Sequence, residues 1–170
     1  ADMSIEYLSM QARAGANALQ IFDSWVGAVN STEYEQAIFP HMKRIISTVK
    51  SRFPNLSLAM NGVGTDHLVS TWAKLPLDVI ALDWRSSLGA AKDRGVTQTV
   101  QGNLDPAYLY GDTKTIAKVV DEILMDGVRH GKHIFNLGHG VFPEADPAKL
   151  HWLTDYVHEK SRELWARESR

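Results

Sequence analysis

The stretch His133-Ile-Phe-Asn-Leu-Gly-His-Gly140 is an apolar, strand-like run that stops at two glycines on either side of one histidine. Glycine adopts backbone angles closed to other residues and leaves room for close approach, so Gly138 and Gly140 are predicted to present the His139 ring in open space. Histidine donates or accepts hydrogen bonds and titrates near neutral pH, which suits binding or catalysis. The alternative interpretation is a tight turn in which His139 packs or caps locally.

Four further short runs have the length and composition of strands: Ala18–Phe22, Ser57–Asn61, Asp78–Leu82 and Gln98–Gly102. Helical periodicity and capping residues predict helices over Ile5–Gly15, over Phe39–Phe53, from Thr65 or Asp66 through Trp72, from Ser86 or Ser87 through Ala91, from Asp112 or Thr113 to near Gly127, and from Asp146-Pro147 onward. Strands and helices therefore alternate. Because a helical crossover joins parallel neighbours, the predicted class is α/β with a parallel sheet.

Two parallel architectures fit this order, a TIM-type (β/α)8 barrel and a doubly wound sheet. Most runs end in polar residues, namely Asp23-Ser24, Asn61-Gly62, Asp83-Trp84-Arg85, Asn103-Leu104-Asp105 and Gly138-His139. A barrel gathers all such ends on one rim, whereas an open sheet gathers those near its switch point, so the pattern favours the barrel. Five strands cannot close it. We expect one partial barrel domain over residues 1–170.

Composition narrows the function classes. The chain has 170 residues, 44% of them hydrophobic, which suffices for one sizeable core. A formal charge of −2 without long blocks of like charge argues against a nucleic-acid surface or a polybasic membrane patch. No apolar run approaches the ~18 residues of a membrane span, and Ala1–Met10 has no signal-peptide pattern. We expect a cytoplasmic protein with a small-molecule ligand.

Few side chains are candidates for chemistry. Ser24 follows the first run and lacks a nucleophile elbow, so a binding hydroxyl is favoured over a covalent role, with a helix or turn cap as the local alternative. Asp83 beside Trp84 is interpreted as a capping carboxylate next to a core aromatic. The absence of cysteine excludes thiolate metal sites and cysteine nucleophiles from this chain, and the other histidines lack metal-ligand spacing. No metal site is predicted.

Four segments in this order resemble the uroporphyrinogen decarboxylase family: Leu19–Trp25, Leu82–Trp84, Val100–Pro106 and Phe135–Gly140. The resemblance runs from about Ile5 to the last helix. It implies a carboxy-lyase with a TIM-barrel fold and no cofactor. Such an enzyme removes carbon dioxide from the four acetate side chains of uroporphyrinogen III, giving coproporphyrinogen III in haem and other porphyrin synthesis, and works as a homodimer.

The resemblance transfers two site residues. Ser24 matches a substrate-contacting hydroxyl, and His139 matches the pocket histidine, which gives it a substrate-binding and catalytic role. The chain corresponds to the C-terminal five β/α units of the barrel. The family's arginine-bearing N-terminal loop, its pyrrole-binding aspartate and its pocket tyrosine belong to the first three strands and match nothing here. A substrate with eight carboxylates needs several cations, and at the strand ends here we find Arg85 and His139, so we expect little activity from this segment alone.

Two alternatives stay open. A corrinoid-linked methyltransferase of the same superfamily would use zinc with a thiolate ligand, which the lack of cysteine opposes. The other is a noncatalytic half-barrel that binds a tetrapyrrole or assembles with another subunit. Ala18–Phe22 and His133–Leu137 would both be sheet edges, and uncovered edges invite pairing. We therefore expect self-association, domain exchange or an origin in a longer polypeptide.

Overall fold

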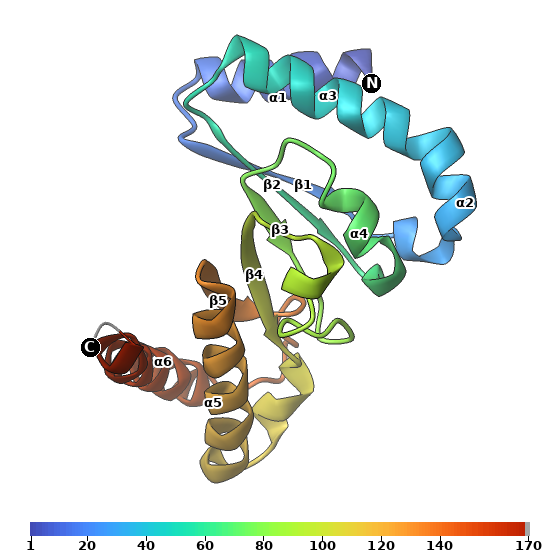
Figure 1. Cartoon of the computed structure of the whole chain (residues 1–170). Helices are drawn as coiled ribbons and strands as arrows, with labels where there is room; N and C mark the ends of the chain where they lie inside the picture. The colour runs from blue at the N-terminus through green and yellow to red at the C-terminus, as the bar shows by residue number, and fades with distance from the viewer. Residues whose placement is uncertain (169–170) are drawn as a thin grey trace.

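The protein is built on one parallel five-stranded sheet. A computed structural model describes residues 1–168, with side chains described to Ala166 (Figure 1). The strands are β1 (Ala18–Asp23), β2 (Ser57–Gly62), β3 (Val79–Ala81), β4 (Thr99–Leu104) and β5 (His133–Leu137). All four pairings are parallel, and the strands lie in chain order. A sheet in chain order has no switch point, so five successive units of an unclosed barrel, and not a doubly wound sheet, are confirmed.

The sheet is curved into a trough. The Gln101 side chain on β4 donates a hydrogen bond of 3.4 Å to the Gln20 side chain on β1, although β2 and β3 lie between these strands. One register row joins residues from all five strands on this concave face: Phe22, Asn61, Ala81, Gln101 and Ile134. β1 and β5 are the two edges of the sheet, as predicted.

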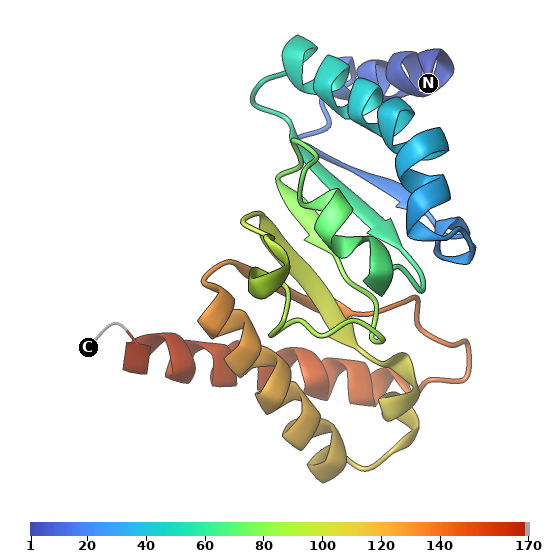
Figure 2. The same ribbon diagram turned by 45° about the vertical axis from the view of Figure 1, so that its right-hand side comes forward.

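Helices cover the convex face. The main ones are α1 (Asp2–Arg13), α3 (Phe39–Arg52), α4 (Val69–Trp72), α5 (Thr113–His130) and α6 (Pro147–Glu168), and α2 (Ser31–Glu33) leads through a π-helical turn over Tyr34–Ile38 into α3. α1 and α3 lie side by side at one end of the sheet, and α5 and α6 lie at the other (Figure 2). The ends of the chain are consequently far apart (Figure 1). Among residues 1–168, no helix is both long and apolar enough to cross a membrane.

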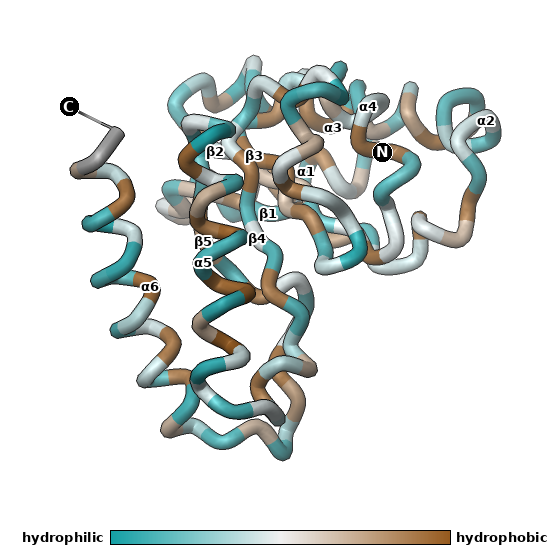
Figure 3. Tube along the Cα trace, turned by 60° about the horizontal axis from the view of Figure 1, so that its bottom comes forward, coloured by the Kyte–Doolittle hydropathy of each residue, from teal (hydrophilic) through white to brown (hydrophobic). Residues whose placement is uncertain are grey.

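The apolar core consists of two clusters. The larger one joins α1, α3 and α4 to the first four strands and includes the fully buried Ile46, Leu58 and Trp72. The smaller one joins α5 and α6 to the end of β4, around Leu104 and Leu153. Apolar and polar residues alternate along the turns of α5 and α6, as expected for helices with one buried face (Figure 3).

Two large aromatic side chains of the larger cluster pair their polar groups with each other. The Trp72 indole donates to the Tyr34 hydroxyl at 2.9 Å, and both side chains are fully buried. Burial raises the pKa of Tyr34 to about 12, because the charged phenolate is disfavoured away from water.

Two sequence predictions of helices are wrong in detail. Residues 86–91 form bends and turns, not a helix, and a short 3-10 turn follows at Lys92–Arg94. The Asn103 amide on the next strand donates to the Ser86 carbonyl at 2.7 Å, a tertiary contact that ties this segment to β4. The helix predicted to end near Gly127 continues to His130, and Gly131 ends it in the left-handed conformation at φ +91°.

Candidate active site at the strand ends

A cavity of about 570 Å³ opens on the concave side at the carboxyl ends of the strands. Its lining comes from β1, β2, β5 and the loops after them, and includes Gln20, Phe22, Ser24, Asn61, Asn136 and His139. Ser24 directly follows β1 and His139 follows β5, so side chains from the two edge strands face one space. The structure therefore brings together the two predicted site residues, both of which are exposed.

The two glycines beside His139 have different surroundings. The backbone N–H of Gly138 donates to the Leu104 carbonyl at 2.7 Å, and a β-carbon at Gly138 would lie 2.5 Å from the backbone nitrogen of Trp84. A β-carbon at Gly140 would meet nothing within 4 Å. Close backbone approach therefore requires glycine at 138, while the far side of the histidine is open as predicted. The Trp84 ring meets the His139 ring edge-on, with 6.0 Å between centroids.

Asp83 connects three of the strand-end loops. Its carboxylate is fully buried and accepts hydrogen bonds from the backbone N–H of Gly64 at 2.6 Å and from the Arg85 guanidinium at 2.9 Å. Its backbone carbonyl accepts from the Asn103 amide at 2.9 Å. Asp83 is thus a capping residue as interpreted: it accepts from the backbone N–H of Arg85 at 3.1 Å in its own loop and also caps the loop after the neighbouring strand β2. Because the backbone N–H of Gly64 donates to Asp83, it does not point to a ligand.

The sequence indicates Arg85 only as a strand-end cation and does not reveal the cluster to which it belongs. Its guanidinium carbon lies 4.1 Å from the centroid of the Trp84 ring, and half of its side chain is exposed. Asp83, Arg85, Trp84 and His139 therefore form one connected cluster across the ends of β3 and β5. The sequence signal is the triplet Asp83-Trp84-Arg85 at a strand end, but its link to His139 depends on the fold.

Asp23 and its neighbour Ser24 line different hollows of the surface. It lines a groove of about 540 Å³ between β1, α1 and α3, together with apolar side chains such as Tyr7 and Met42. Burial raises the pKa of Asp23, and a hydrogen bond from the backbone of Val26 opposes that shift. This groove runs along the free edge of the sheet at β1.

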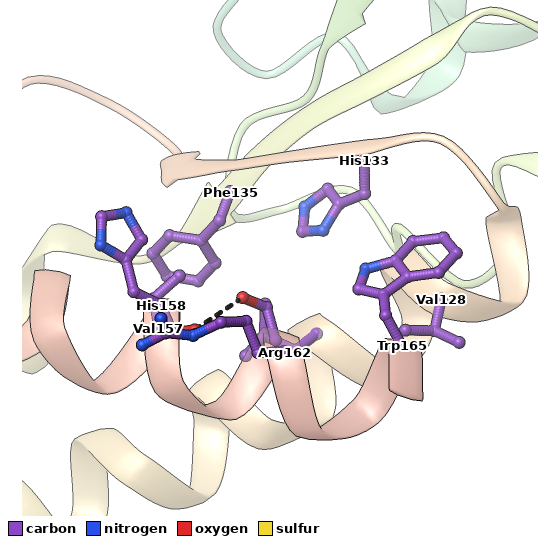
Figure 4. Close-up of a pocket in the computed structure, with 9 residues that line it drawn as sticks. Val128, His133, Phe135, Val157, His158, Arg162 and Trp165 are labelled. Carbon is purple, nitrogen blue, oxygen red and sulfur yellow. Dashed lines mark hydrogen bonds between the residues drawn. The ribbon is translucent and has the colours of Figure 1, made fainter. Parts of the chain in front are cut away.

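A corresponding groove of about 390 Å³ lies between β5, α5 and α6, on the convex side (Figure 4). Figure 4 shows His133 and Phe135 pointing from β5 toward Arg162 and Trp165 on α6. The Nε2 atom of His133 donates to the Gly102 carbonyl at 2.7 Å, a contact that links β5 to β4. The groove is separate from the cavity that holds Ser24 and His139.

Known proteins resemble this chain in sequence and in structure. Residues 1–160 match the family described as "Uroporphyrinogen decarboxylase (URO-D)". Proteins named uroporphyrinogen decarboxylase from Staphylococcus aureus strains JH9 and N315 are each 48% identical over 157 residues, covering 92% of this chain and 45% of their own length. The chain thus spans less than half the length of these relatives.

Among solved structures, a methyltransferase from Methanosarcina mazei superposes with a TM-score of 0.76. The match covers 96% of this chain and 47% of that protein, at 16% sequence identity. At this identity the likeness concerns the fold and does not distinguish one chemistry from another.

Proposed function

Because this chain belongs to the uroporphyrinogen decarboxylase family, we propose that it forms part of an enzyme that removes carbon dioxide from the acetate side chains of uroporphyrinogen. The observation that supports this most is the strand-end cavity shared by Ser24 and His139. In this proposal His139 contacts the reacting pyrrole as a proton carrier, and the Ser24 hydroxyl binds a carboxylate of the same substrate.

The chemistry needs a proton and an electron sink. Protonation of a pyrrole carbon creates a cation that accepts the electron pair of the breaking C–CO2 bond. Carbon dioxide leaves, the exocyclic methylene takes up a proton to become a methyl group, and loss of the first ring proton restores the pyrrole. Each acetate thus consumes one proton and releases one carbon dioxide. A histidine exposed to the cavity suits these transfers because its ring nitrogens can both donate and accept a proton.

We further propose that strands from the part of the relatives that this chain does not cover complete the barrel. The groove between α1 and β1 and the groove between β5 and α6 both follow free strand edges. Apolar side chains are exposed beside them, among them Met3, Tyr7, Phe22, Ile134 and Trp165. Unpaired parallel edges and apolar surface of this kind favour the docking of further strands. We propose that the chain self-associates through the same edges when these further strands are absent. When they are present, we propose that the completed barrel forms the homodimer implied by the family.

An anaerobic assay with uroporphyrinogen tests the function. The chain is measured alone and mixed with the part of the Staphylococcus aureus enzyme that it does not cover, and less carboxylated products are followed. We expect turnover in the mixture and almost none from the chain alone. In the mixture, His139→Ala should lower kcat by roughly a hundredfold or more, because it removes a proton carrier. His41→Ala, at an exposed histidine of α3, is the matched control.

Each outcome of this assay is informative. Strong turnover by the chain alone would contradict the need for further strands. A mixture that forms a complex and binds porphyrin without releasing carbon dioxide would favour the noncatalytic half-barrel. Sedimentation velocity of the same samples reports self-association and dimer formation.

A further inference from the structure

The strand-end loops contain very little positive charge. The carboxyl ends of the five strands with the residues next to them, 23–30, 61–68, 82–91, 103–112 and 137–146, hold a single arginine and no lysine. That arginine is Arg85. A ligand rich in carboxylates is attracted by cations at the rim of its site, and Arg85 is the cation of this kind in these segments.

Arg85 is oriented by two contacts that leave part of it open. Its Nη1 atom donates to the buried Asp83 carboxylate at 2.9 Å, and its guanidinium carbon lies over the Trp84 ring, 4.1 Å from the ring centroid. The carboxylate is fully buried whereas the arginine side chain is 51% exposed, so the positive end of the pair faces solvent. A guanidinium has five N–H donors in a planar fork, and those not used by Asp83 remain for a carboxylate.

The position of Arg85 relates it to the cavity. Trp84, on which it stacks, touches His139, and Asp83, to which it is paired, bonds to Gly64 next to Val63. Val63 and His139 both line the strand-end cavity. Arg85 does not itself line the cavity, but through Trp84 and Asp83 it is connected to two of the loops that do. Its orientation is set before any ligand arrives, which reduces the entropy cost of binding.

We propose that Arg85, supported by Trp84 and Asp83, binds a peripheral carboxylate of the acidic tetrapyrrole while the reacting ring lies near His139. This inference rests on the proposed function and assigns a binding and specificity role to a residue that takes no part in proton transfer. Its ligand class is a carboxylate on the rim of a macrocycle, held by charge and by the planar fork.

Binding of uroporphyrin, the air-stable oxidised form of the substrate, tests the proposal on this chain. Dissociation constants are measured at low salt for the parent and for Arg85→Gln, Arg85→Lys and Arg129→Gln. We expect Arg85→Gln to weaken binding about tenfold, because a charge-assisted hydrogen bond is lost. Arg85→Lys should restore part of the affinity. Arg129 is an exposed arginine paired with Asp126 at the end of α5, and its variant should bind like the parent.

A second measurement avoids the variants, since Arg85→Gln leaves the buried Asp83 without its cation and can disturb folding. In NMR spectra of the parent chain, uroporphyrin should shift the Arg85 Nε–H and Trp84 indole signals and leave the Arg129 Nε–H signal in place. Unshifted Arg85 and Trp84 signals on a chain that binds uroporphyrin, or equal affinities of the parent and a folded Arg85→Gln, would refute the role of Arg85 alone. Absence of uroporphyrin binding by the parent, both alone and mixed with the part of the Staphylococcus aureus enzyme that it does not cover, would contradict the proposed function as well.

Discussion

At the scale of single residues, Gly138 determines where His139 lies. Its backbone N–H donates a hydrogen bond to the Leu104 carbonyl, and the backbone of Trp84 leaves no room for a β-carbon. We expect Gly138→Ala to lower the free energy of unfolding by about 1–3 kcal/mol, because the added carbon meets backbone atoms that cannot move away cheaply. Urea unfolding measures the loss.

Gly140→Ala is the matched control for that change, since it adds the same carbon two residues away in open space. It should alter the unfolding free energy by less than about 0.5 kcal/mol. Equal losses at both positions would mean that the chain around His139 adjusts freely, and that the contact with Trp84 does not fix the loop.

His133 links stability to pH. Burial lowers its pKa below the usual value near 6.5, and the nearby His130 lowers it further, while the hydrogen bond to Gly102 and the charge of Asp126 oppose these effects. Above about pH 7 the ring is neutral in both states and its full contribution to stability is present. As the pH falls through about 6.5 the unfolded chain takes up a proton first, so stability decreases by at most about 1.4 kcal/mol per pH unit.

Urea unfolding between pH 7.5 and 5.5 checks this sign. His133→Gln keeps a donor for the Gly102 carbonyl but does not titrate, so it should lose less stability than the parent as the pH falls. His41→Gln removes an exposed histidine and should follow the parent. The interpretation is wrong if His133→Gln and the parent show the same pH dependence.

Residues differ in how far the sequence alone reveals them. The placement of Ser24 and His139 at the carboxyl ends of strands could be predicted because each stands in a recognisable segment, while their roles stay a prediction. The cluster around Asp83 could not, because its contacts with Gly64 and Asn103 join residues about twenty positions apart. Which loops meet in this way depends on the order of strands in the sheet, and no local pattern contains that information.

At the scale of elements, local signals succeeded where periodicity was strong. β5 begins and ends as predicted, and α5 follows its apolar stripe from the cap at Asp112. The segment 86–91 takes part in a tertiary contact that its local pattern does not contain, since the Asn103 amide on the next strand donates to the Ser86 carbonyl. The end of α5 was predicted near Gly127, although that glycine has a tertiary role. A β-carbon there would overlap His133, so glycine serves packing inside the helix and not its termination.

At the scale of the whole molecule, the two ends of the sheet are the least buried parts. β2 and β3 carry the fully buried Leu58, Met60 and Ile80, whereas no residue of β5 is fully buried. The neighbours that would cover β1 and β5 in a closed barrel are not among the described residues of this chain. Regions with few buried apolar contacts open locally at a lower free energy than the core.

Amide hydrogen exchange followed by mass spectrometry tests this picture of the edges. In the chain alone, β5 and α6 should exchange faster than β2 and β3. Adding the part of the Staphylococcus aureus enzyme that this chain does not cover should slow exchange in α1 and β1 and in β5 and α6, because new strands would pair with both edges, while β3 in the middle should change little. His139→Ala provides the control, since it alters the cavity and leaves the edges intact, so its pattern of protection should match the parent. Protection confined to the strand-end loops, with both edges unchanged, would mean that the added segment binds at the cavity without completing the sheet.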